Sequence, residues 1–303
     1  MRVTNSIITR NSQYRLQSGL AGVDRLREDI SSGLRIRKMS DDPTSASEVV
    51  RVGSSMRAIT QFRRNINIGV SRATAEENVL NSLGNTLSRG AELGIQAASA
   101  TANTQSRLII KKEIDQLLDQ AAQLGNTRFG DEYLFGGTRS GEAPFVTPPP
   151  ASPTSFSALT LSGNPVNPSG NPTLEIGDNK FVTPNHNGTQ VFLDTDALAA
   201  MRALSDALGA DDTAAIRAAT DRITAANSNV QALVGTQGAR INEMEDAKTR
   251  LDQMENDLLA YRSDLRDTEI DKAMVDLVGK QTLYQAAMGA TSRILGLSLA
   301  NYI

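Results

Sequence analysis

The residues that could carry chemistry in this chain are scattered and form no recognisable catalytic or metal-binding set. Its 303 residues include no cysteine and a single histidine, His186. A lone histidine without cysteine lacks the ligand set of a zinc site, so we interpret His186 as a loop histidine. No Gly-rich phosphate loop, His-Glu-x-x-His sequence or nucleophile motif accompanies the many serines and threonines. We therefore predict a protein that is not an enzyme and has no cofactor or metal ion.

Two acidic pairs and one Asn-x-Thr sequence each allow a ligand-binding and a structural interpretation. The pairs are Asp194 with Asp196 and Asp211 with Asp212. Neither pair has the glycine and the distal glutamate of a calcium loop, so we expect them to serve as N-caps of helices. Asn187-Gly188-Thr189 matches an N-glycosylation acceptor, and we expect a plain turn there.

The composition narrows the class of protein further. A net charge of −3 gives no reason to expect nucleic acid as a partner. A hydrophobic content of 39% with only 4% aromatic residues suits long helices better than a thick sheet core. No apolar run approaches the ~18 residues of a membrane span. The N-terminal stretch has no continuous apolar segment, so we expect no cleavable secretion signal.

The strongest pattern is a heptad repeat between Thr44 and Gly94. One apolar row recurs every seven residues without a miss: Val52, Ile59, Ile66, Ala73, Leu80 and Leu87. A second row is offset from it by four and three: Val49, Met56, Arg63, Val70 and Glu77. Alternating steps of three and four place both rows on one helix face, as in the seam of a coiled coil. A helix of this length spans about 75 Å and requires partners along its seam.

Two further helices are predicted to cover that seam. The first covers residues 106–124, which carry apolar residues in steps of four and three and follow a short connection rich in Thr and Asn. The second carries its own heptad row: Ile216, Ile223, Val230, Gln237, Met244, Leu251, Leu258 and Leu265. This row passes Gly235 and Gly238 without a phase shift, so we expect one helix through both glycines, although each costs about 1 kcal/mol relative to Ala.

The two ends of the chain each predict an amphipathic helix, over residues 12–34 and from Ile270 onwards. Their apolar stripes, which we call the axial residues, are Leu16, Leu20, Val23, Ile30, Leu34, Ile270, Met274, Leu277, Tyr284, Met288 and Leu295. Burying one such side chain contributes about 1.5–3 kcal/mol. Ordering each residue of the backbone costs about 1–2 kcal/mol. One stripe therefore does not offset the ordering of some 20 residues, and we expect neighbouring subunits to complete the burial.

Four charged residues fall on seam positions and leave two interpretations open. They are Arg27, Arg63, Glu77 and Lys248. Long charged side chains can reach past a seam into solvent. Charges at a seam can also fix the register between helices or contact adjacent subunits.

Between the helical halves the character of the chain changes. Nine of its ten prolines lie between Pro144 and Pro184, which opposes helix formation. The short β-leaning runs that remain are Phe156–Leu161, Thr173–Ile176, Lys180–Val182 and Gln190–Leu193. Residues 177–179, Gly-Asp-Asn, suggest a tight hairpin turn between two of them, and residues 126–138 suggest another turn and hairpin.

These elements predict a mainly α protein with a small β insert. We expect a long antiparallel, coiled-coil-like helical bundle with its termini together and the β-rich domain at the far end. The predicted domains are an N-terminal axial segment (1–43), two halves of a helical shaft (44–140 and 196–266), a β-rich inserted outer domain (141–195) and a C-terminal axial helix (267–303).

Three stretches of the sequence carry a resemblance to a known family. Residues 31–43, SSGLRIRKMSDDP, resemble the N-terminal motif of the flagellin family, a Ser-Gly-x-Arg-Ile run followed by an Asp-Asp pair and a long helix. The matching residues are Ser32, Gly33, Arg35, Ile36, Asp41 and Asp42. Residues 270–303 look like the C-terminal axial helix of that family. Residues 126–138 are similar to the segment that closes the N-terminal helical block in the members at the hook–filament junction.

The resemblance covers residues 12–140 and 212–303 and leaves the insert uncovered. It implies a flagellin-like fold and an extracellular structural subunit at the hook–filament junction, exported through the flagellar type III channel without a cleavable signal peptide. The implied partners are further copies of the chain in a ring-like oligomer, the first hook-associated protein, flagellin, an export chaperone and the export apparatus, with no nucleic acid and no membrane. A flagellin filament subunit and a non-flagellar coiled-coil scaffold remain alternatives. The C-terminal ending, which lacks the Gln-rich tail usual in flagellins, favours the junction members over flagellin, and the motif at residues 31–43 counts against the scaffold.

Overall fold

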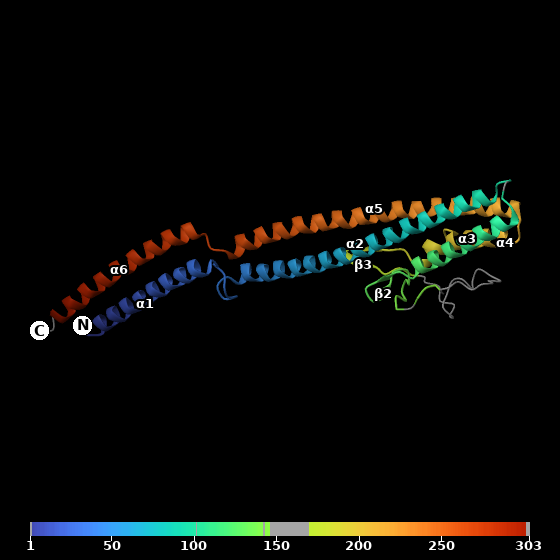
Figure 1. The fold of residues 1–303 in the computed structure, drawn as a ribbon. Helices are drawn as coiled ribbons and strands as arrows, with labels where there is room; N and C mark the ends of the chain where they lie inside the picture. The colour runs from blue at the N-terminus through green and yellow to red at the C-terminus, as the bar shows by residue number, and fades with distance from the viewer. Residues whose placement is uncertain (1, 101, 142, 146–169, 301–303) are drawn as a thin grey trace. The chain divides into compact units, whose positions relative to one another are not determined.

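Over the residues that the structure describes, the protein is mainly helical, with two small β-hairpins (Figure 1). The computed structural model describes residues 2–100, 102–141, 143–145 and 170–300, without the side chains of residues 2–6, 8–9 and 294–300. The helices are α1 (Arg2–Ser32), α2 (Pro43–Ala97), α3 (Thr104–Gly125), a π-helical turn η2 (Thr189–Leu193), α4 (Ala197–Gly209), α5 (Thr213–Arg266) and α6 (Ile270–Ala300). The strands are β1 (Arg128–Phe129), β2 (Glu132–Tyr133), β3 (Leu174–Gly177) and β4 (Lys180–Val182).

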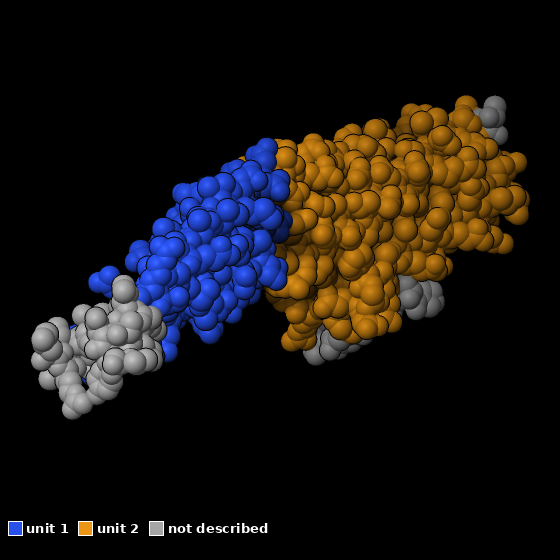
Figure 2. Space-filling view, turned by 90° about the vertical axis from the view of Figure 1, so that its left-hand side faces the viewer, with its two compact units in different colours: residues 1–58, 253–303 blue, residues 59–252 orange. Residues whose placement is uncertain are grey.

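The chain divides into two compact units, shown in different colours in Figure 2. Unit 1 comprises residues 1–58 and 253–303, and unit 2 comprises residues 59–252. Both long helices, α2 and α5, contribute residues to each unit. The boundaries of the units do not coincide with those of the five domains predicted from heptad phase, so that domain scheme stays a prediction.

In unit 2, α2 and α5 pack antiparallel in one constant register (Figure 1). Arg63 lies 3.0 Å from Asp252, and Lys248 donates to the side-chain oxygen of Asn67 at 3.0 Å. About six turns further along α2, the Asn227 amide donates to the Ser88 hydroxyl at 3.0 Å. Arg63 and Lys248 therefore link the two helices, which agrees with a register role for these two seam charges.

The two predicted heptad rows are confirmed as the seam of unit 2. Their central members, which are at most 3% exposed, are Ile59, Ile66, Ala73, Leu80 and Leu87 of α2 with Ile216, Ile223, Val230 and Met244 of α5. Helix α5 runs unbroken through Gly235 and Gly238. Because a shift of one residue would rotate the row off the seam, this unbroken phase keeps both rows facing each other.

The second row predicted on α2 is wrong for unit 2. Val70 and Glu77 are only half-buried. The buried row is instead Gly69, Glu76, Leu83, Gly90 and Ala97. A Cβ added at Gly69 would lie only 2.8 Å from the Met244 sulfur, so small residues are needed for close helix packing. Apolar patterning missed this row because two members are glycines and one is a buried glutamate.

The core of unit 2 is completed by α3, α4 and three phenylalanines. Phe192 makes edge contacts with Phe135 and Phe145, with ring centroids 5.3 and 5.0 Å apart. All three rings are at most 2% exposed. Aromatic rings in such edge-to-face pairs add to the energy of area burial, so this cluster joins the middle segments to the long helices.

The middle segment contains less strand than the sequence predicted. Strands β3 and β4 pair antiparallel, with Leu174 opposite Val182, and Asn179 adopts a left-handed φ of 55° in the turn, as predicted. Gln190–Leu193 is helical rather than extended, which corrects that prediction. The Asn187 side chain accepts the Gln190 N–H at 2.9 Å, and this local bond starts a helical turn. Residues 156–161 lie outside the described part of the chain.

The predicted helix caps are realised in part. Asp212 accepts the N–H groups of Ala214 and Ala215 at 2.9 and 3.1 Å and so caps α5. Asp196 occupies the N-cap position of α4 but makes no capping bond, because its carboxylate binds Arg222. Asp211 instead accepts hydrogen bonds from Arg107 and Thr104, which lower the pKa of its carboxyl group.

His186 lies in a loop, as expected, but it is buried and paired. The carboxylate of Glu76, 0% exposed, lies 2.7 Å from His186 Nδ1 and accepts the His186 N–H at 3.0 Å. The neighbouring Pro184 carbonyl accepts a 2.7 Å hydrogen bond from the Gln237 amide. Buried polar groups are costly unless they are hydrogen-bonded, so these contacts fasten the segment around His186 to both α2 and α5.

Candidate assembly interface

The site lies in unit 1, where α1 packs against α6. Val23 and Ala273 are buried between the two helices, with 3% and 7% exposure. Gly19 and Gly22 allow a close approach: a Cβ at Gly19 would lie 3.4 Å from the Tyr284 ring. This seam is thin, because a pair of helices can bury only one narrow stripe of each partner.

The predicted axial residues differ in how far they are buried. Val23 is buried, and Leu16, Ile30, Leu34, Leu277 and Tyr284 are half-buried. Leu20, Ile270, Met274 and Met288 are exposed by 42–54%. The side chain of Leu295 lies outside the described residues. The half-buried residues already have neighbours within the chain. An intermolecular role for the axial residues stays a prediction, and the exposed residues support it best.

Several larger exposed apolar residues were not predicted from the sequence. Tyr14 and Val275 are each 73% exposed, Leu283 is 71% exposed and Val278 is 63% exposed. They lie outside the single stripe that a search in steps of three and four selects. The available signal was that α6 is apolar on more than one face, which is unusual for a helix with only one partner.

The flagellin-like motif forms a short strap, residues 33–36, across the junction between α5 and α6. Arg35 N–H donates to the Arg266 carbonyl at 2.8 Å, and Thr268 N–H donates to the Gly33 carbonyl at 2.9 Å. The Arg35 guanidinium adds a 2.7 Å bond to the Leu265 carbonyl. Gly33 ends α1 with a left-handed φ of 69°, a conformation that glycine adopts without strain. The strap therefore ties the end of α1 to the junction between α5 and α6 within unit 1.

The two aspartates of the motif organise the turn before α2. Asp42 caps α2 by accepting the Ser45 hydroxyl at 2.6 Å and the Ser45 N–H at 3.2 Å, and these bonds lower the pKa of its carboxyl group. Asp41 accepts the N–H groups of Lys38 and Arg37 at 3.0 and 3.2 Å, which lower its pKa in the same way. Both carboxylates thus act as structural acceptors of the turn.

Arg37 fastens the same turn to the end of α1. It donates to Asp29 at 3.0 Å and also to Glu28, and the hydrogen bond to Glu28 raises the pKa of the guanidinium. Asp29 is only 7% exposed. The motif residues therefore hold α1, the turn and the start of α2 in one arrangement. Ser32 contributes by accepting the Leu34 N–H at 3.2 Å.

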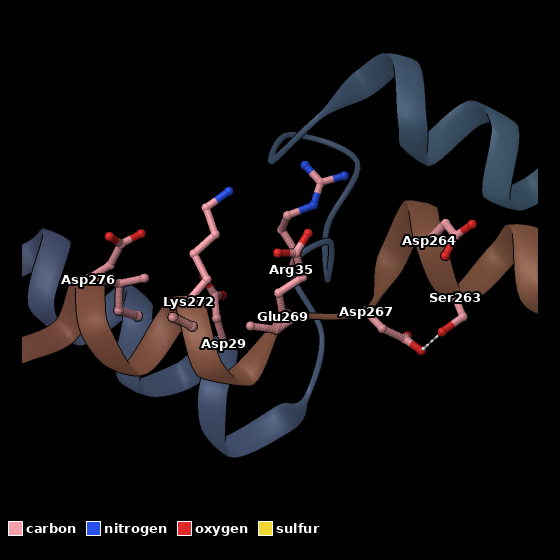
Figure 3. A pocket seen from close by; sticks show the side chains of 11 residues that line it. Asp29, Arg35, Ser263, Asp264, Asp267, Glu269, Lys272 and Asp276 are labelled. Carbon is pink, nitrogen blue, oxygen red and sulfur yellow. Dashed lines mark hydrogen bonds between the residues drawn. The ribbon is translucent and has the colours of Figure 1, made fainter.

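A cleft of about 550 Å³ opens beside the strap (Figure 3). Its charged lining is mostly acidic, with Asp29, Asp264, Asp267, Glu269 and Asp276 against Arg35 and Lys272. Ser263 donates to Asp267 at 2.5 Å, the bond drawn in Figure 3. Among the described residues, no group of three or more His, Cys, Asp or Glu side chains could hold a metal ion.

A second hollow, the groove, lies further along α1 and α6. It has a volume of about 480 Å³. It is lined by Tyr14, Arg15, Ser18, Gly19 and Gly22 of α1 with Lys280, Leu283, Tyr284 and Ala287 of α6. Its charged residues are both cations. The described helices include none long and apolar enough to cross a membrane.

Comparison with known proteins identifies the class of these helices. Residues 3–140 match the bacterial flagellin N-terminal helical region. Phase 1 flagellin of Salmonella naestved is 35% identical over 121 residues, which are 40% of this chain and 23% of that flagellin. The chain thus spans under a quarter of the length of the flagellins it matches.

Solved structures with a similar fold include FlgL proteins of two bacteria. FlgL of Bacillus cereus superposes with a TM-score of 0.56 at 23% identity, over 70% of this chain and 99% of that one. The flagellar junction protein FlgL of Legionella pneumophila superposes with a TM-score of 0.55 at 15% identity, over 74% of this chain and 100% of that one. The fold of this chain is therefore FlgL-like.

Proposed function

We propose that this chain is a structural subunit of the bacterial flagellum at the hook–filament junction. The observation that carries the proposal is the extent of the fold match. The FlgL chains are covered over 99–100% of their length, whereas the flagellins are covered over 23%. A chain that contains nearly the whole fold of these FlgL chains, but matches under a quarter of a flagellin, fits an adaptor better than a filament subunit.

The role is one of assembly rather than catalysis. Exposed apolar residues on α1 and α6, such as Tyr14, Val275 and Leu283, form a surface suited to contacts with neighbouring subunits. The partners we propose are copies of this chain in a ring-like oligomer, the first hook-associated protein, flagellin, and the export chaperone and apparatus. Export would proceed to the cell exterior without a cleavable signal peptide.

The proposed arrangement of the assembled subunit follows the predicted domains. Segments 1–43 and 267–303 would form the inner axial layer, and the shaft segments 44–140 and 196–266 would form the next layer. The segment 141–195 would face outward at the far end of an antiparallel bundle. This division is supported by the contrast between the exposed apolar residues of α6 and the buried seam of unit 2.

Deletion of the gene from its bacterium tests the role. We expect bare hooks and unassembled flagellin in the medium, with filaments restored by the wild-type chain. Normal filaments in the deletion strain would contradict any structural role at the junction.

A filament subunit is the second candidate, because the sequence identity of 35% is to flagellins. Immunogold labelling of intact flagella separates the two roles. We expect label confined to the base of the filament. Label along the whole filament would assign the chain to the filament instead.

A further inference from the structure

The two most exposed apolar surfaces of α6 lie on opposite sides of that helix. One, which we call the ridge, consists of Asp271, Met274, Val275 and Val278, spaced at i, i+3, i+4 and i+7. Its three apolar residues are 54%, 73% and 63% exposed. The groove residues of α6, Lys280, Leu283, Tyr284 and Ala287, repeat the same spacing nine residues later. Nine residues make about two and a half turns, so ridge and groove face opposite ways.

The charges of the two surfaces are complementary. The groove contains Arg15 and Lys280 and no carboxylate. The sequence contains no Asp or Glu over residues 2–23, and the nearest acid to Lys280 on α6, Asp276, is not part of the groove lining. The ridge begins with an exposed carboxylate, Asp271. An apolar groove with two cations therefore favours an apolar helix that carries an acid, which is the composition of the ridge.

We infer that the ridge of one copy of this chain lies in the α1–α6 groove of the next copy. The inference rests on the proposed function, because it specifies how the terminal helices self-associate. An amphipathic helix in a groove is a common mode of recognition, with anchors at i, i+3, i+4 and i+7. Because ridge and groove lie on different faces, the contact is heterologous and adds copies one after another, in a closed ring or an open helix.

The spacing of the anchors sets the axial offset between neighbours. In the inferred contact, ridge positions 271, 274, 275 and 278 of one copy lie level with groove positions 280, 283, 284 and 287 of the next. Pairing ridge with groove displaces parallel copies of α6 by about 14 Å, nine residues at the usual rise. This displacement brings Asp271 of one copy towards Arg15 and Lys280 of the other.

Disulfide cross-linking tests the pairing directly, because the chain has no cysteine. The test variant combines Val275→Cys with Leu283→Cys, one residue on the ridge and one in the groove. The control combines Val275→Cys with Thr282→Cys, both on the ridge side and both exposed. Positions 275 and 283 are about 12 Å apart along α6, too far for a disulfide within one copy. Each variant is expressed in the deletion strain, and isolated flagella are oxidised and run on non-reducing gels.

We expect a ladder of dimers, trimers and higher species from the 275/283 variant and none beyond dimers from the 275/282 variant. Equal ladders, or none from the 275/283 variant in flagella that contain it, would overturn the pairing while leaving self-assembly intact. A disulfide to a different flagellar protein, identified by mass spectrometry, would show that this other protein binds in the groove and would overturn the pairing. Normal filaments in the deletion strain itself would contradict the proposed function, whatever the gels show.

Charge reversal provides a second readout that does not depend on disulfide geometry. Arg15→Glu with Lys280→Glu reverses the groove, and Arg10→Glu with Arg293→Glu makes the same charge change at exposed positions outside it. Because like charges across an interface oppose association, we expect the groove variant to reduce incorporation into flagella at least about tenfold relative to the control. Circular dichroism of both purified variants establishes that they are equally helical. Equal incorporation would count against the groove as the binding surface.

Discussion

The helix seams of unit 2 and of unit 1 have similar apolar spacing but differ in how completely they are buried. In unit 2, residues such as Leu80, Leu87 and Ile223 are 0% exposed, because α3, α4 and the phenylalanine cluster surround the α2–α5 pair. In unit 1, α6 leaves Val275 and Leu283 more than 70% exposed. Apolar periodicity therefore predicts that a helix has a partner, but the number of neighbours decides whether that partner lies in the same chain.

The largest expected difference between the units concerns core truncation. Phe192→Ala removes a fully buried ring that contacts Phe135 and Phe145, and we expect it to lower the free energy of unfolding by about 3–5 kcal/mol. Leu283→Ala removes an exposed side chain of unit 1, and we expect a change below about 0.5 kcal/mol. Urea unfolding followed by far-ultraviolet circular dichroism measures both. Comparable losses of unfolding free energy in the two variants would contradict this difference between the units, because Leu283 would then stabilise the isolated chain.

The next effect concerns the buried polar pair of unit 2. Glu76→Leu leaves the His186 N–H and ring without their acceptor, and each unsatisfied buried group costs about 1–3 kcal/mol. Glu77→Leu is the matched control on the adjacent, half-exposed residue. We expect it to leave stability within about 0.5 kcal/mol. If the two variants unfold at the same urea concentration, Glu76 is not the structural acceptor we describe.

Replacing a glycine of the long helices by alanine should have a smaller effect, and its sign should differ between Gly235 and Gly94. Gly235→Ala meets nothing within 4 Å and should stabilise the chain by about 1 kcal/mol through helix propensity. Gly94→Ala places a Cβ 2.3 Å from the Thr220 hydroxyl and should destabilise it by about 1–3 kcal/mol through overpacking. Adding Thr220→Ala should recover part of that loss. Stabilisation by Gly94→Ala alone would mean that α2 and α5 are not in close contact there.

The smallest effect is a pH dependence confined to the turn before α2. Hydrogen bonds from Ser45 lower the pKa of Asp42, and those from Lys38 and Arg37 lower the pKa of Asp41. The unfolded chain then binds protons more readily than the folded chain. Stability is therefore present above the unfolded aspartate pKa of about 3.9 and is lost as the pH falls through the lower folded values. Asp42→Asn should flatten this acid-side slope in circular dichroism titrations. An unchanged slope would contradict the assigned role of Asp42.

The packing of the long helices could be predicted from the sequence where it depends only on the spacing of apolar residues. The heptad row from Ile59 to Leu87 and the row from Ile216 to Met244 are buried as expected, because one helix face repeats every seven residues. The row through Gly69, Glu76 and Gly90 could not be predicted in that way. Its members are buried for their small size or for a distant hydrogen-bond partner, His186, and neither property appears in local hydropathy.

The candidate site shows the same limit. The motif residues Gly33 and Arg35 were selected by resemblance, and their backbone bonds to Arg266 and Thr268 depend on contacts more than 200 positions away. The ridge residues Val275 and Val278 were missed because a single-stripe search assumes one partner per helix. Gln190–Leu193 was predicted as a strand because its β-branched and aromatic residues outweighed the local Asn187 cap.

Residue-resolved hydrogen exchange of the free chain and of isolated flagella tests the central claim most directly. Amides of α2 and α5 within residues 59–252 should be protected in both states, because their seam is complete within one chain. Amides of α1 and α6 should exchange rapidly in the free chain and become protected on assembly, because neighbouring copies complete their burial. Equal protection of α1 and α6 in both states would contradict the division of apolar surface between folding and assembly.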